Sequence, residues 1–585
     1  MLMAMNCTAA ADPNKVIRYA FQIAETSFDP ARVSDRYSNT LMENVLESML
    51  SYDYLARPVK LRANTLSTLP EIRDSGTIFI FRIKPGIYFT PHEAFRGARR
   101  ELTAADYEFS IKRHFDPKLR SPWMFLLEDN LIGGKDAYNR AKAAGKFDYD
   151  APIDGLRTLD RYTLQIHLKS PDFNLPYIMA MPAMGALARE VVDMYGEDVG
   201  SHPVGSGPYV VKEWKRSSKI VLEANPEFRE EIFQAEAGDN SLDRGIAAHL
   251  RGKRLPLVGR VEIYIVEENQ PRWLAFLNRE HDYIERFPEE YANIATPGGK
   301  LAPNLAKQGI SLQRPIEPTL TYYGFNMDDP VVGGYVPERI ALRRAVNLAF
   351  NINEELLIIR KSQSVKAESP IPPGVAGSNA DFRSAAGEYN PAKAKALLDL
   401  FGYVDRDGDG YRELPDGRPL VIEYSSTPAF VDRQYDELWK KSLNAVGIRM
   451  SSRKAKWPDL LKATKAGQFQ FRGLAWGADY PDAENFLQLL YGPNTGQSND
   501  ARFRLPAYDR LYEKAKQLPD SPERSRIYEE MTRLILVYAP WKLGTYRVDG
   551  NLIHPWVIGY KKHPILRAPW RYLDVDIEQQ TAARR

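Results

Sequence analysis

The chain contains a single cysteine, Cys7, among its 585 residues. One cysteine excludes an intramolecular disulfide and any zinc site built from several cysteines. No run of about 18 apolar residues occurs, and the nearest approach, "LPYIMAMPAMGALA" from Leu175, is interrupted by Pro182. The body of the chain is therefore predicted to be a soluble protein that is held together by its hydrophobic cores.

No excess of one charge is present either. Lys and Arg total 79, Asp and Glu total 76, and the two signs are interspersed along the chain. A balanced distribution creates no broad field for nucleic acid or for an anionic membrane, so neither partner is predicted. Aromatic residues make up 11% of the chain, with 32 tyrosines, a composition that suits amphipathic binding pockets.

Signatures of catalysis are missing as well. None of the eight histidines lies in an H-E-x-x-H pair, and no G-x-S-x-G elbow, phosphate loop or dinucleotide-binding glycine pattern occurs. His281 and Glu285 could share a helical face, but a solvated pair explains them better than a metal site. We therefore predict no enzyme activity and no cofactor. The carboxylate pair of a glycoside hydrolase has no fixed sequence spacing, so a secreted hydrolase remains an alternative.

The N-terminus, "MLMAMNCTAAADPNK", begins with apolar residues and continues with small ones before Asp12. This order resembles the end of a secretory signal peptide that lacks its basic start, so residues 1–11 are interpreted as a residual signal segment. Two alternatives remain, namely lipid attachment at Cys7 and an ordinary disordered terminus.

Alternating and helical patterns are mixed throughout the chain, whose length predicts two or three domains. "DSGTIFIFRIKPGIYF" predicts a strand with one buried face after a turn, and "GRVEIYIVEE" predicts another strand. "LTAADYEFSIKRHF" begins with Thr103 and Asp106 at the spacing of a capping box. "PERIALRRAVNLAF" and "YNPAKAKALLDLFGY" also predict helices, the second with Asn390 as N-cap. The fold class is therefore α/β or mixed α+β, and the segment 236–256 is predicted to be a charged loop-like insert.

The stretch "DRDGDGYRELPD" resembles a calcium-binding loop. Asp405, Asp407 and Asp409 occupy alternate positions, Gly410 is sixth and Glu413 is ninth. The twelfth residue is an aspartate instead of the usual glutamate, and no helix clearly follows. A plain connection rich in Asp and Gly is therefore preferred over a metal site.

Two aspartates follow a predicted strand in "GLAWGADYPDAENFLQLLYGPN". Asp482 directly precedes a helical pattern and is predicted to cap it, a role worth about 1 kcal/mol. Asp479 lies in the preceding turn, near Trp476, and needs another partner if it is buried. A local turn cap and a ligand contact are equally open for Asp479 from spacing alone.

Several segments in order resemble landmarks of the family 5 extracellular solute-binding proteins, the dipeptide and oligopeptide receptors of ABC importers. They run from about residue 16 to 570 and are "TSFDPARVSDRYSNTLMENVLESMLSYD", "TIFIFRIKPGIYF", "ELTAADYEFSIKR", "GSGPYVVKEWKRSSKIVLEANPEF", "YYGFNMDDPVV", "LRRAVNLAFNINEELL", "NPAKAKALLDLFGY" and "WGADYPDAENFLQLLYGPN". Each segment is weak evidence alone, and their common order makes the resemblance strong.

The resemblance implies a periplasmic-binding-protein-like fold of two lobes, built from three domains, with a hinge and a ligand cleft between the lobes. The implied division is residues 12–55, 201–315 and 540–585 for domain I of lobe 1, 56–200 for domain II of lobe 1, and 316–539 for lobe 2.

The resemblance also implies the binding residues. Asp479 matches the aspartate that receives the α-ammonium group of a peptide ligand. The residues beside it, which pair with the ligand backbone, map to Ala475, Trp476 and Gly477. The opposing strand maps to Arg36, Tyr37 and Ser38, and the aromatic residues of the pocket map to Trp123 and Tyr546.

The resulting hypothesis is a monomeric periplasmic receptor that captures oligopeptide-like solutes and delivers them to an ABC permease in the inner membrane, with membrane tethering as an alternative. The family also includes receptors for oligosaccharides, glutathione, nickel chelates, haem and opines, so another small solute remains an alternative cargo. The segments "FTPHEAFRGARRELTA" and 236–256 are longer than the family pattern, which weakens the inference of cargo from ordinary members.

Overall fold

A computed structural model describes residues 11–585, so Cys7 and most of the predicted signal segment lie outside the described residues. The chain divides into two compact units. Unit 1 holds the described chain up to Pro288 together with Leu301–Gln313 and Gly550–Arg585, and unit 2 holds Glu289–Lys300 and Arg314–Asp549. Each unit contains helices and sheets, which confirms the mixed α/β class.

Unit 1 contains two four-stranded sheets. The first has the order β1-β12-β9-β8, with β1 parallel to β12 and the other neighbours antiparallel. The second has the order β4-β5-β7-β6 and is antiparallel throughout. The strands are β1 (Asp12–Phe21), β4 (Glu71–Arg73), β5 (Ile78–Arg82), β6 (Leu156–Asp160), β7 (Thr163–His167), β8 (Tyr209–Lys215), β9 (Lys219–Ala224) and β12 (Val258–Ile265).

The start of helix α2 in unit 1 lies where the sequence predicts it. Helix α2 begins after Thr103, and the side chain of Asp106 accepts a hydrogen bond from the Thr103 N–H at 2.7 Å, which completes the capping box. The main helices are α1 (Arg36–Val45), α2 (Ala104–Arg113), α3 (Gly134–Ala144), α5 (Arg189–Tyr195), α6 (Ser241–Leu250), α7 (Asn269–Leu277) and α18 (Ile577–Arg584).

Of two local predictions in unit 1, one is confirmed and one is wrong. Strand β5 buries Phe79 and Phe81 on the predicted face, and Arg82 on the opposite face is exposed, although Ile80 of that face is buried too. The segment 236–256 is not a loop, since it contains helix α6. Asn240 caps that helix by accepting from the Asp243 N–H at 2.9 Å, and Ile246 and Leu250 bury one face of it.

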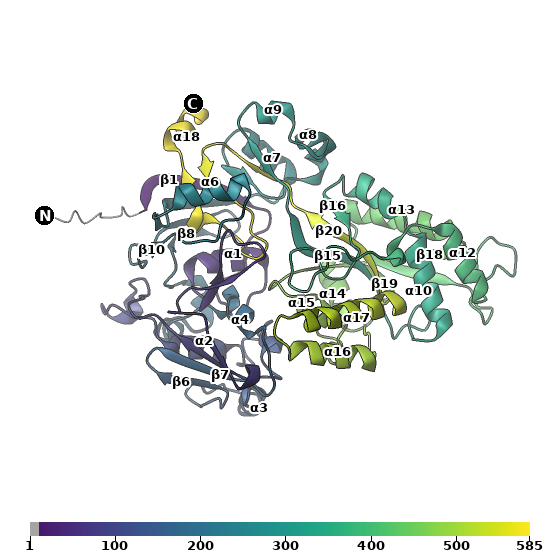
Figure 1. Ribbon diagram of the computed structural model, residues 1–585, viewed down its shortest axis with the longest axis horizontal. Helices are drawn as coiled ribbons and strands as arrows, with labels where there is room; N and C mark the ends of the chain where they lie inside the picture. Colours follow the sequence, from purple (N-terminus) through teal and green to yellow (C-terminus); the bar gives the residue numbers. More distant parts are fainter. Residues whose placement is uncertain (1–10) are drawn as a thin grey trace. The chain divides into compact units, whose positions relative to one another are not determined.

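Unit 2 is organised around a six-stranded sheet with the order β16-β20-β15-β19-β17-β18 (Figure 1). The central strand β15 pairs antiparallel with both β19 and β20, and β17 is parallel to β18 and β19. The strands are β15 (Ile316–Phe325), β16 (Ser364–Lys366), β17 (Val421–Ser426), β18 (Arg449–Lys454), β19 (Phe471–Gly477) and β20 (Trp541–Val548). Strand β20 thus belongs to unit 2, whereas the division expected from the sequence assigned residues 540–585 to the first lobe.

Hydrophobic cores cover both faces of this sheet. Alternate residues of β15 enter different cores: Tyr323 packs in a core with residues of α10, α12 and α13, and Tyr322 in a core with residues of α15, α16 and α17. Helices α15, α16 and α17 lie side by side in Figure 1. The main helices are α10 (Pro337–Ala349), α12 (Pro391–Leu400), α13 (Phe430–Asn444), α14 (Trp457–Lys465), α15 (Glu484–Leu487), α16 (Pro506–Lys516) and α17 (Pro522–Tyr538).

The helix predictions for unit 2 are confirmed. Helix α10 buries Ala341 and Ala345 on the predicted face. Helix α12 starts at Pro391, and the side chain of Asn390 accepts from the Lys393 N–H at 3.0 Å. Among residues 11–585, no helix combines the length and the apolar character that a membrane span requires.

Candidate functional site

The turn after β19 brings three polar side chains of unit 2 together. Asn485, at the start of α15, is 1% exposed. Its side-chain oxygen accepts two hydrogen bonds at 3.0 Å, one from the Trp476 indole N–H and one from the Asp479 backbone N–H. Its side-chain nitrogen donates to Asp479 Oδ2 at 3.3 Å. The amide of Asn485 therefore joins the two residues that the sequence singled out.

The edge of β19 is open beside this turn. On one side, β19 pairs with β15 along its whole length. On the other side, the pairing with β17 covers only Phe471 and Arg472. Within the described residues, the segment 473–477 therefore has no strand partner on that side, and both Ala475 and Gly477 are exposed. Such an edge offers backbone donors and acceptors to an added strand.

A pocket of about 230 Å³ lies against this edge, within unit 2. Gly473 and Ala475 of β19 line it, and their direct partners on β15, Tyr323 and Thr321, line it too. Further lining comes from the end of β17, from α13 and from α14, and includes Tyr424, Tyr435, Trp457 and the hydroxyl-bearing residues Ser425, Ser426 and Thr427. Aromatic walls with several hydroxyl groups suit an amphipathic ligand.

Charged groups also reach the pocket. Arg360, Arg472 and Arg547 line it, and Asp432 is the one carboxylate among its described lining residues. Arg472 is buried, and desolvation lowers its pKa. Its guanidinium donates to the Leu460 carbonyl oxygen at 3.0 Å and to the Thr464 hydroxyl. The pocket is therefore equipped for polar groups as well as for apolar ones.

Asp482 has a different role from Asp479. It is 1% exposed, and Arg524 holds it through two hydrogen bonds of 2.8 and 3.2 Å. The Tyr528 hydroxyl donates to it at 3.0 Å and the Glu484 N–H at 2.9 Å. The predicted contact with the helix start is present, although the N-cap position itself is occupied by Ala483. The sequence missed the ion pair because Arg524 lies on α17, far along the chain.

Tyr546 lies in the same sheet as the β19 residues. Leu320 of β15 faces Trp476 on one side and Tyr546 on the other, so the three side chains form a row across three strands. The Tyr546 hydroxyl donates to the Ser369 carbonyl oxygen at 2.6 Å and accepts from the Ser369 N–H at 3.1 Å. Tyr546 is 5% exposed, so its contribution to a ligand site stays a prediction.

The other predicted site residues lie in unit 1. Arg36, Tyr37 and Ser38 form the first turn of α1, and Asp35 caps them by accepting from the Ser38 N–H at 2.8 Å. The strand conformation expected for this segment is therefore wrong, because the cap fixes a helical turn. Trp123 is almost fully buried, and its indole N–H donates to the Val33 carbonyl oxygen at 2.8 Å. Whether these four residues contact a ligand stays a prediction.

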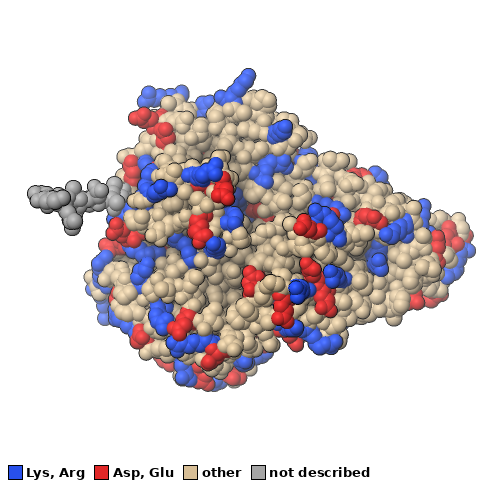
Figure 2. All heavy atoms as spheres, viewed as in Figure 1, with Lys and Arg blue, Asp and Glu red and all other residues tan. Residues whose placement is uncertain are grey.

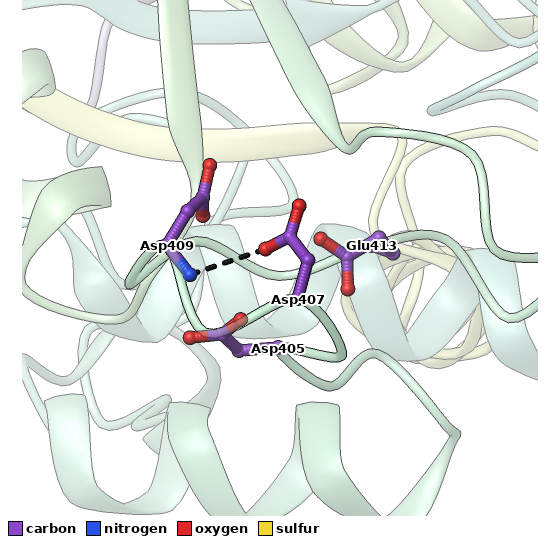
Figure 3. Close-up of side chains that lie close together, drawn as sticks. All are labelled: Asp405, Asp407, Asp409 and Glu413. Carbon is purple, nitrogen blue, oxygen red and sulfur yellow. Dashed lines mark hydrogen bonds between the residues drawn. The ribbon is translucent and has the colours of Figure 1, made fainter.

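The acidic loop of unit 2 gathers the carboxylates of Asp405, Asp407, Asp409 and Glu413 (Figure 3), with one oxygen from each within 4.8 Å of the others. Hydrogen bonds within the loop account for this arrangement. Asp405 accepts from the N–H groups of Gly408 and Gly410, at 2.7 and 2.9 Å, and Glu413 accepts from the Arg406 N–H at 2.7 Å. The plain-connection interpretation therefore explains the loop, and calcium binding stays an untested alternative.

Acidic and basic residues are interspersed on the face shown in Figure 2, and neither kind forms a large patch there. This agrees with the nearly equal totals of 79 basic and 76 acidic residues. A general electrostatic attraction for polyanions is not built into this face.

Comparison with known proteins identifies a family of solute-binding proteins and relatives named as binding proteins. Residues 60–498 match the family described as bacterial extracellular solute-binding proteins, family 5, middle region. The chain is 26% identical to the di/tripeptide-binding protein 2 of Pseudomonas aeruginosa (strain UCBPP-PA14), over 97% of this chain and 96% of that protein. It is 23% identical to the heme-binding protein A of Haemophilus influenzae, over 95% and 91% respectively.

Solved structures show the same fold. The periplasmic binding protein DppA of Helicobacter pylori, associated with an ABC transporter and solved in complex with the peptide STSA, superposes with a TM-score of 0.72 at 20% identity. The superposition covers 96% of this chain and 99% of that protein. This likeness confirms the periplasmic-binding-protein-like fold predicted from the sequence.

Proposed function

The chain belongs to the family 5 bacterial extracellular solute-binding proteins, and we propose that its cargo is a short peptide with a free amino group, bound against β19 of unit 2. One observation carries the proposal: Asp479 lies just beyond the open edge of β19. An aspartate at the end of an unpaired strand edge can bind the ammonium group of an extended peptide whose backbone continues along that edge. The similarity to a di/tripeptide-binding protein supports a peptide cargo.

The backbone of the ligand pairs with residues 473–477 as an added strand. Main-chain hydrogen bonds of this kind provide affinity that does not depend on the peptide sequence. Ala475 and Gly477 are small and exposed, so they leave room for the side chains of the ligand. The neighbouring pocket then receives one or more of those side chains.

The ammonium group of the ligand is bound by Asp479. An ammonium carries three donors and one positive charge, and a carboxylate neutralises the charge through a short, charge-assisted hydrogen bond. Backbone carbonyl groups near the turn accept the remaining hydrogens. Trp476 forms an apolar wall beside the contact, fixed by its hydrogen bond to Asn485.

Unit 1 contributes the second half of the binding site in this proposal. Arg36, Tyr37, Ser38 and Trp123 contact the ligand from unit 1, and the two units act as lobes that close on it. Ligand contacts made with both lobes favour the closed state over the open one. The finer division of the lobe formed by unit 1, into residues 56–200 as one domain and the rest of that unit as the other, is part of this proposal.

The protein acts as a receptor and performs no chemistry. Its relatives carry the names of binding proteins. We infer that the protein is exported to the periplasm, works as a monomer and delivers its ligand to the permease of an ABC importer. A hydrolase acting on glycosides would need two carboxylates facing one pocket. In the pocket beside β19, Asp432 is the one carboxylate among the described lining residues.

Native mass spectrometry of protein purified without refolding tests the cargo. We expect bound masses that match short peptides, and we expect the Asp479→Ala variant, purified in the same way, to carry far less of them. The control is Asp328→Ala, which removes an exposed aspartate of unit 2 that pairs with Arg504 at 2.8 Å. This variant should carry as much bound peptide as the parent. Bound sugar, haem or bile acid in place of peptide would contradict the proposal.

A further inference from the structure

We propose that Asn485 is a positioning residue for ligand recognition: its buried amide fixes the Asp479 carboxylate and the Trp476 ring in the arrangement that receives the amino group of the ligand. The inference rests on the proposed function, since it assigns the amine contact to Asp479. It adds a residue that would act without touching the ligand.

The side chain of Asn485 matches its neighbours because an amide offers both a hydrogen-bond acceptor and a donor. Two N–H donors, from Trp476 and from the backbone of Asp479, face one side-chain atom, which must be an oxygen. A carboxylate oxygen of Asp479 faces the other side-chain atom, which must be a donor. Aspartate at position 485 would place a second negative charge against Asp479, and leucine would leave all three groups without this partner.

Burial makes this pattern energetically important. Asn485 is 1% exposed, so water cannot replace its hydrogen bonds without a rearrangement of the turn. A buried polar group that loses its partner costs more than the same group in solvent. Helix α15 also holds Asn485 in place, because its neighbours Phe486 and Leu487 are fully buried in the core beneath the sheet.

A double-mutant cycle separates positioning from general stability. The probe is a pool of alanine peptides of two to five residues with free amino groups, with binding measured by native mass spectrometry up to millimolar concentration. Asn485→Leu should weaken binding about 10- to 100-fold in the parent protein, as expected when buried hydrogen bonds are lost. In the Asp479→Ala background the same substitution should change binding less than about threefold, because the group that Asn485 positions is already gone.

Asn485→Asp provides a second readout and a variant that retains the shape of the side chain. Two carboxylates in contact share one proton, which raises the pKa of the pair in this variant. A proton then competes with the ammonium group, so peptide affinity should fall with decreasing pH more steeply in Asn485→Asp than in the parent. A purely structural role would not add this pH dependence.

Asn499→Leu is the matched control. Asn499 is also buried in unit 2, and its amide donates to the carbonyl oxygens of Tyr491 and Phe503 at 3.0 and 2.8 Å. The substitution should lower stability comparably and leave peptide affinity unchanged.

The outcomes distinguish this inference from the proposed function. Equal losses from Asn485→Leu with and without Asp479 would overturn the positioning role, as would binding of Asn485→Leu within threefold of the parent. If the parent binds no peptide of the pool, or Asp479→Ala binds as well as the parent, the proposed function itself fails and the inference fails with it.

Discussion

Removing Asp482 should destabilise unit 2 far more than a helix cap would. Asp482 and Arg524 have side-chain exposures of only 1% and 3%, and their closest nitrogen and oxygen atoms are 2.8 Å apart. Asp482→Ala breaks the buried ion pair with Arg524, a change that typically costs about 3–5 kcal/mol. Loss of the contacts from Tyr528 and Glu484 acts in the same direction. The sequence alone predicted only a helix cap at Asp482, whose removal would lower the free energy of unfolding by about 1 kcal/mol.

The control for this prediction is Asp328→Ala. Asp328 makes a similar two-pronged pair with Arg504, at 2.8 and 3.3 Å, but both side chains are nearly half exposed. A surface pair of this kind contributes less than about 1 kcal/mol. Urea unfolding followed by tryptophan fluorescence gives the free energy of unfolding for both variants. Equal losses in the two variants would refute the argument from burial.

Three further predictions concern stability and closure. Burial lowers the pKa of His114 to about 4, so between pH 6.5 and 4 the unfolded chain binds a proton at this residue that the folded chain does not. His114 should therefore contribute about 3 kcal/mol to the fall in the free energy of unfolding over this range, and His114→Gln should reduce the fall by about that amount in urea titrations. Burial lowers the pKa of Lys542 to about 8, so the buried charge lowers the free energy of unfolding at neutral pH, and this free energy rises as the pH increases from 8 towards 10.5. Lys542→Met should therefore raise the urea midpoint at pH 7, and a lower midpoint would contradict this prediction. Saturation with the alanine peptide pool should reduce the radius of gyration in small-angle scattering, and an unchanged profile would count against lobe closure.

Features that depend on neighbouring residues could be predicted from the sequence. The capping box of Thr103 and Asp106 and the start of α12 at Asn390 need only a few consecutive residues, and both are present in the structure. Strand β19 and the turn that carries Asp479 also follow from local alternation. Helix α6 was missed because Gly245 and several charged residues obscure its pattern, although Asn240 is a recognisable cap.

Features that depend on distant residues could not be predicted. Arg524 approaches Asp482 across 42 positions of sequence, and no local pattern marks that pair. The open edge of β19 exists because β17 pairs with only its first two residues, which is a property of the whole sheet. Asn485 was overlooked because a single polar residue at the start of an apolar helix carries no distinct signal. The helical turn at Arg36 follows from the cap by Asp35, which outweighed the expected strand.

The most direct test of the account compares free and N-acetylated peptide in titration calorimetry, using the alanine peptide that binds most tightly. Asp479→Ala should weaken binding of the free peptide by about 3–5 kcal/mol, or two to three and a half decades, because the ammonium group loses its counter-charge. Acetylation should weaken binding to the parent to a similar degree and should have little further effect on Asp479→Ala. Binding of the free peptide to Asp479→Ala within threefold of the parent, or equal binding of the acetylated peptide to the parent, would contradict amine recognition at β19.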